Sequence, residues 1–258
     1  MACVLAVPLA AWTQGKEAKP AEAPKAQPGV NWAGQVIRAT GQGAPDMKAQ
    51  NAAQARLGAE MAAKLDALRN LLGQVKGTSI DGTRKMGDLM AKDEVRARVE
   101  GLVKGYKIVN KRYFSDNGVE LEVEVPVSML ADVIDPDATQ VLAVGKPEGE
   151  KAATGLVIDA RGLKLTPALM PRVLDGDGKA VYSIDSLSAD ARKTSGVAAY
   201  VASLDDAQKS PKAGDKPLVL KAAKAQGSDL QLAPEDAKKL ATLNTGFLAD
   251  GKVVIVLN

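Results

Sequence analysis

An alanine-rich run between residues 47 and 72 constrains the fold most, because its pattern is typical of one long helix. Large apolar residues recur within it at intervals of three and four, which places them on one face of that helix: Leu57, Met61, Leu65, Leu68 and Leu72. The alanines between them favour helix strongly and permit close packing on a sheet. We therefore predict a helix over residues 47–72 that starts at Asp46 as its N-cap and has these five residues as its apolar, core-facing side.

The segments around this helix predict a small sheet. Residues 31–41 are strand-like and are closed by a Gly41–Pro45 turn. A second amphipathic helix is expected over residues 92–103, with four residues facing inward: Val95, Val99, Leu102 and Val103. Two strands, residues 106–114 and 119–127, flank an Asn117-Gly118 pair that is typical of a β-hairpin. In the second of these strands valine and leucine alternate with glutamate, so one face should be buried and the other solvated.

The remainder of the chain predicts a second, mainly β domain. The pattern weakens over residues 131–153, which we interpret as a linker between a domain at 30–130 and another at 154–258. Strands are expected at residues 156–160, 170–174, 179–183, 196–202, 218–222 and 252–257, with a short helix at 234–243. The predicted fold class is α+β: an N-terminal β-α-(β)-α-β-β domain with a long Ala-rich helix on a small sheet, then a β-rich domain.

The first 29 residues predict export from the cytoplasm. Residues 1–13 contain an uncharged apolar run that resembles a truncated secretory signal without its basic segment. A lipoprotein cleavage box ending at Cys3 and a buried N-terminal strand are the alternatives. Residues 14–29 alternate Lys, Glu, Ala and Pro and are expected to form a disordered tether. No stretch approaches the roughly 20 apolar residues of a transmembrane helix.

The composition excludes several classes of catalyst and partner. The chain has no histidine, which excludes Ser-His-Asp and Cys-His machinery and histidine-ligated zinc. The single cysteine, Cys3, lies in the apolar N-terminal run. Basic and acidic residues number 34 and 31, so there is no strong field for binding nucleic acid. We therefore expect no catalytic residues, no cofactor and no metal site.

Three short motifs have alternative interpretations. Gly41-x-Gly43 between a strand and a helix resembles a dinucleotide-binding turn, but a strand-to-helix turn is the better account. Asp175-Gly-Asp-Gly resembles the start of a calcium loop but lacks its remaining ligands, so a hairpin turn is expected. Asp159 and Arg161, which leave an apolar strand, could form an ion pair that pins a loop or could present an interaction site.

The chain resembles the LPP-twenty lipoprotein family of bacterial outer-membrane-associated proteins, which includes components of the flagellar outer rings and disks. Four features between Trp32 and Val127 carry the resemblance: the Ala39–Gly43 turn, the Ala-rich helix with Gln50, Ala52, Ala53 and Ala55, its ending from Asn70 to Gly77, and the hairpin from Gly118 to Val127. Residues 155–162 and 167–175 look like a C-terminal extension that often accompanies this domain. The resemblance implies an αβ domain that associates with itself or with other envelope proteins.

These observations together predict a non-catalytic protein of the periplasm or the outer membrane, possessing a signal peptide and acting through protein association in a flagellar or other envelope assembly. The partners would be envelope proteins or further copies of the chain, and a lipid anchor is not shown by the sequence. The alternatives are a periplasmic module that binds a small ligand or peptidoglycan, and a hydrolase that uses only carboxylates.

Overall fold

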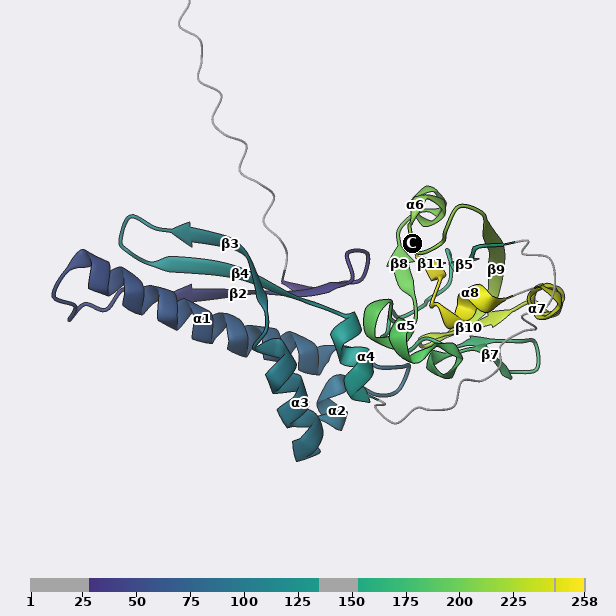
Figure 1. Ribbon diagram of the computed structural model, residues 1–258, viewed down its shortest axis with the longest axis horizontal. Helices are drawn as coiled ribbons and strands as arrows, with labels where there is room; N and C mark the ends of the chain where they lie inside the picture. The colour runs from purple at the N-terminus through teal and green to yellow at the C-terminus, as the bar shows by residue number, and fades with distance from the viewer. Residues whose placement is uncertain (1–27, 135–152, 244, 258) are drawn as a thin grey trace, which may run out of the picture.

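A computed structural model describes residues 28–134, 153–243 and 245–257 of the protein. It confirms the predicted α+β class, with a long helix in the N-terminal domain and a mainly β second domain (Figure 1). Among the described helices, none combines the length and the apolar character needed to cross a membrane. The predicted signal segment and most of the predicted tether lie outside the described residues.

The N-terminal domain is built on an antiparallel sheet with the strand order β1-β2-β4-β3. The strands are β1 (Gly29–Asn31), β2 (Val36–Gly43), β3 (Lys107–Tyr113) and β4 (Val119–Pro126). Strand β4 alternates as predicted, with its valines and leucine buried and its glutamates partly exposed. The hairpin is also confirmed, because Asn117 has a φ of 66° and the Phe114 amide donates to the Gly118 carbonyl at 2.9 Å.

Helix α1 (Ala52–Gly77) runs lengthwise over β2 and β4. Its N-cap is Asn51, whose side chain accepts a hydrogen bond from the Gln54 amide at 2.8 Å, rather than the predicted Asp46. The predicted turn at Gly41–Pro45 is wrong at its start, since Gly41 and Gly43 belong to β2 and pair with Leu121 and Val119 of β4. Because Gly41 and Gly43 have no side chain, the main chain of α1 can approach β2 closely at these two positions.

The buried face of α1 is the opposite of the one we predicted. The buried residues of α1 recur at every fourth position, and we call them the alanine row: Ala55, Ala59, Ala63, Ala67, Leu71 and Val75. Leu57, Met61 and Leu65 are instead 69%, 60% and 60% exposed, while Leu68 and Leu72 are partly buried against the core. The reason is steric, because a helix that approaches the glycines of β2 this closely can do so only through alanine side chains.

Three shorter helices lie near the C-terminal end of α1 (Figure 1). They are α2 (Met86–Leu89), α3 (Asp93–Val103) and α4 (Ser128–Ile134). Val99 and Val103 of α3 are buried as predicted, and Val95 and Leu102 pack partly buried against the core. Helix α4 occupies the start of the segment predicted as a linker, and residues 135–152 of that segment lie outside the described part of the chain.

The second domain contains a seven-stranded mixed sheet with the order β7-β6-β10-β9-β5-β11-β8. Its strands are β5 (Gly155–Asp159), β6 (Val173–Leu174), β7 (Ala180–Tyr182), β8 (Ala199–Val201), β9 (Pro217–Gln226), β10 (Asp229–Leu232) and β11 (Val253–Val256). Strands β9, β5, β11 and β8 are mutually parallel, and β11 is entirely buried, as its apolar sequence predicts. The helical segments are η1 (Ile184–Ser186), α5 (Ala189–Thr194), α6 (Leu204–Lys209), α7 (Pro234–Thr242) and α8 (Gly246–Ala249).

The two domains are joined by main-chain and aromatic contacts. The amides of Leu169 and Met170 donate to the carbonyls of Ser79 and Ile80 at 2.9 and 2.8 Å. Elsewhere along the seam the ring of Trp32 meets that of Tyr200 edge-on, at a centroid distance of 5.4 Å. The sequence alone gave no sign of these contacts, and the two hydrogen bonds hold Ser79 and Ile80 against the second domain.

Candidate functional site

The outward face of α1 is the first candidate site. It consists of a row of residues four apart, Ala53, Leu57, Met61 and Leu65, and of the small residues Gly58 and Ala62 beside it, all of them exposed. We call these six residues the outward face. Monomeric proteins rarely place large apolar side chains together in water unless the patch has a partner.

Charged residues on both flanks of α1 interact with each other or with the sheet. On one flank Glu60 accepts hydrogen bonds from Lys111 at 2.8 Å and pairs with Lys64 at 3.1 Å, and these interactions lower the pKa of Glu60 to about 2. On the other flank Asp66 accepts from the Gln42 amide at 2.9 Å. The six residues of the outward face are uncharged, and the exposed Arg69 follows Leu65 at the end of the row.

Asp159 and Arg161, predicted from the sequence as an ion pair or an interaction site, form an ion pair. The Arg161 guanidinium donates to both carboxylate oxygens of Asp159 at 2.8 Å, and the hydrogen bonds lower the pKa of Asp159. Asp159 is the last residue of β5, at the carboxyl edge of the parallel strands. The pair thus pins the loop that follows β5, and a role in interaction remains a prediction.

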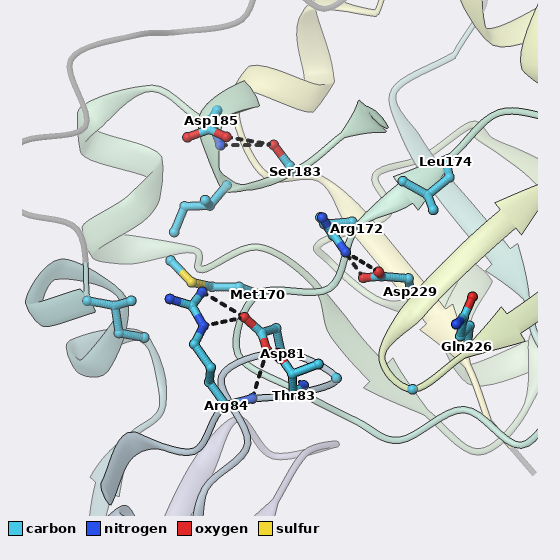
Figure 2. A pocket seen from close by; sticks show the side chains of 14 residues that line it. Asp81, Thr83, Arg84, Met170, Arg172, Leu174, Ser183, Asp185, Gln226 and Asp229 are labelled. Carbon is cyan, nitrogen blue, oxygen red and sulfur yellow. Dashed lines mark hydrogen bonds and ion pairs between the residues drawn. The ribbon is translucent and has the colours of Figure 1, made fainter. Parts of the chain in front are cut away.

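A cleft of about 730 Å³ lies at the seam between the domains and is the second candidate site (Figure 2). Its walls come from the turn after α1, the end of α4, β6, η1 and the β9–β10 turn. Two arginine–aspartate pairs stand on these walls, Arg84 with Asp81 and Arg172 with Asp229. Ser183 and Asp185 contribute polar atoms from η1, and the apolar lining consists of Ile134, Met170, Leu174 and Ile184.

Asp81 organises the turn that carries Arg84. Its carboxylate accepts hydrogen bonds from the amides of Thr83 and Arg84, from the Thr83 hydroxyl and from the Arg84 guanidinium, all at 2.8 to 2.9 Å. Partial burial acts to raise the pKa of Asp81, but these hydrogen bonds outweigh it and lower the pKa to about 2. Arg84 is therefore held in place from within its own turn.

We expect this turn to lose stability in acid. The pKa of Asp81 is lower in the folded protein than in the unfolded chain, so its contribution is complete above about pH 4 and disappears as the pH falls toward 2. Allowing for solvent screening, the contribution is about 1 to 2 kcal/mol. Urea unfolding of the wild type and of Asp81→Asn should therefore differ at pH 6, and less than half of that difference should remain at pH 2.5. A difference that stays constant with pH would contradict this account.

The described residues contain no group of three or more His, Cys, Asp or Glu side chains that could hold a metal ion. The Asp175-Gly-Asp-Gly segment forms the hairpin turn between β6 and β7, with the Asp175 carboxylate accepting from the amides of Asp177 and Lys179. The cleft residues were not predicted from the sequence. The Asp81-Gly82-Thr83 pattern could have indicated a turn, but Arg172 and Asp229 are 57 residues apart and carry no local signal.

Comparison with known proteins found a match for the second domain. Residues 155–258 match the family model of the second domain of Treponema pallidum Tp0624. The matched segment begins at β5 and includes the whole parallel part of the second sheet, so the second domain is similar to that bacterial domain. No curated protein matches the chain. The resemblance of Trp32–Val127 to the LPP-twenty family stays a prediction.

Proposed function

We propose that this protein is a non-catalytic component of the bacterial cell envelope that acts by associating with other proteins, in the periplasm or at the outer membrane. The observation that carries the proposal is the uncharged outward face of α1, with Leu57, Met61 and Leu65 in solvent. The signal-like N-terminus and the resemblance to the LPP-twenty family support the envelope location, and a flagellar assembly is one setting in which such a protein would act.

The outward face has the features of a surface that pairs with a second copy of itself. The large side chains at positions 57, 61 and 65 form a ridge, and Gly58 and Ala62 form a shallow groove beside it. Helices pack by placing the ridge of one into the groove of the other. A two-fold symmetric contact requires both features on the same patch, and a patch without charge avoids placing like charges opposite each other.

The size of the outward face indicates a weak contact. From Ala53 to Leu65 it extends about 18 Å along the helix and about 10 Å across, or about 200 Å². Stable interfaces bury about 800 Å² on each partner. We therefore expect association that depends on concentration and that becomes persistent where copies are gathered in one assembly.

Met61→Arg should abolish this association. The arginine would place two like charges at the centre of the contact, whereas a side chain that is 60% exposed contributes little to folding, so stability should change by less than about 0.5 kcal/mol. In sedimentation equilibrium the average mass of the wild-type chain should rise with concentration, and that of Met61→Arg should stay at the monomer value of 26.8 kDa.

Met47→Arg is the matched control, because Met47 is 92% exposed and lies before α1. It should associate as the wild type does. If the wild type remains monomeric throughout, or if the two variants behave alike, the outward face is not a contact surface between copies.

A second candidate function is favoured by the cleft between the domains. A concave site of about 730 Å³ with mixed polar and apolar walls is within the size range of small-ligand sites. This supports the alternative of a periplasmic module that binds a small ligand or peptidoglycan fragments. The two candidates use different surfaces and are compatible with each other.

A further inference from the structure

The two arginines of the cleft present their charge to solvent, while their partner carboxylates face the protein. The side chains of Arg84 and Arg172 are 54% and 57% exposed, compared with 19% and 15% for Asp81 and Asp229. Each guanidinium uses Nε and one Nη for its aspartate. The second Nη of each has no hydrogen-bond partner among the described residues, so it can donate to a ligand.

The two pairs are neighbours although they come from different domains. Arg84 belongs to the turn after α1, and Arg172 precedes β6. Both pairs line the same cleft (Figure 2). The carboxylate of Asp229, and to a smaller degree that of Asp81, raises the pKa of Arg172. A carboxylate bound between the two guanidiniums would therefore contact both domains at once.

Asp185 adds a negative charge to the same cleft. Its carboxylate accepts a hydrogen bond from the Ser183 hydroxyl at 3.2 Å and has no cationic partner among the described residues. With Asp81 and Asp229 already paired, the cleft carries one net negative charge. This balance disfavours a dianion such as phosphate, and it provides one acceptor for an ammonium group beside donors for a carboxylate.

From this arrangement we infer that the cleft binds a zwitterionic ligand of the amino-acid or short-peptide class. The carboxylate lies between Arg84 and Arg172, the ammonium group lies against Asp185, and an apolar side chain packs on Met170 and Ile184. The volume of about 730 Å³ accommodates a molecule of dipeptide to tripeptide size. The inference rests on the second candidate function and is independent of association through α1.

The test is calorimetric titration of the full chain with alanyl-leucine that has free termini. We expect measurable binding, and at least tenfold weaker binding by both the N-acetylated and the C-amidated forms of the dipeptide. Arg84→Gln should weaken binding at least tenfold while Asp81 keeps its bonds to Thr83. Asp185→Asn should remove the preference for the free amino terminus.

Arg161→Gln is the matched control, because Arg161 makes the same kind of exposed pair with an aspartate outside the cleft. It should bind the dipeptide as the wild type does. Absence of heat with any dipeptide at millimolar concentration, or equal binding of inorganic phosphate, would overturn the inference. Repeating the titration with Met61→Arg separates the two proposals, since that variant should bind the dipeptide normally.

Discussion

Gly43→Val should prevent the N-terminal domain from folding stably. A Cβ at this position would lie 1.9 Å from the carbonyl oxygen of Ala59 and 2.7 Å from the amide nitrogen of Ala63, both main-chain atoms of α1. Neither atom can move away unless the whole of α1 moves away from the sheet. We expect a loss of more than about 4 kcal/mol in the free energy of unfolding, which is in the range of severe core disruptions. Urea denaturation followed by circular dichroism measures it.

Gly73→Ala supplies the control for this prediction. Gly73 lies on α1 itself, and a Cβ there meets no atom within 4 Å. Alanine is the better helix former, so this variant should gain about 0.5 to 1 kcal/mol. If Gly43→Val unfolds at the same urea concentration as the wild type, the close approach of α1 to β2 is wrong.

Tyr200→Phe should cost about 2 to 4 kcal/mol, because it leaves two buried main-chain groups without partners. The Tyr200 hydroxyl donates to the Ala168 carbonyl at 2.9 Å and accepts from the Ala168 amide at 3.1 Å. Ala168 is buried and directly precedes Leu169 and Met170, which bond to the first domain. The variant should therefore also loosen the seam between the domains.

Chemical denaturation measures the loss of stability, and hydrogen exchange at the amides of Leu169 and Met170 measures the loosening. Tyr113→Phe is the comparison, since Tyr113 is 49% exposed and its hydroxyl makes a long hydrogen bond of 3.4 Å with Glu60 at the surface. That variant should stay within about 0.5 kcal/mol of the wild type. Equal stabilities for the two variants would show that the Tyr200 hydroxyl does not hold the Ala168 segment.

Local patterns were sufficient to predict much of the first domain. The alternation of β4 and the Asn117-Gly118 turn each depend on neighbouring residues, and both are confirmed. The long helix was also predicted, although both of its ends lie five residues further along the chain than expected. In the second domain, strand β11 could be predicted because its sequence is apolar throughout.

The face of α1 could not be predicted from hydrophobicity alone. The leucine row is the more apolar, and only the contact between Gly41, Gly43 and the alanine row decides in favour of alanine. That contact joins residues about 20 positions apart, so it cannot be detected from the periodicity of the helix sequence. The combination of a Gly-x-Gly strand with an alanine row spaced by four is the signal that could have reversed the prediction.

The candidate sites were less predictable than the fold. Asp159 and Arg161 are neighbours in sequence, and their pairing was one of two outcomes considered. The cleft depends on the docking of two domains, which places Arg84 and Arg172 on the walls of one cavity. Long-range placement of this kind leaves no trace in local periodicity.

The most direct test of association through α1 is crosslinking in the cell from position 61. A photo-crosslinking amino acid would replace Met61 in the full chain, expressed in its native host, and the products would be recovered from the envelope fraction and identified by mass spectrometry. Our account predicts a crosslink to the α1 segment of a second copy, and none when the same residue replaces Met47. Position 61 yielding no product, from a chain confirmed to be in the envelope, would contradict it.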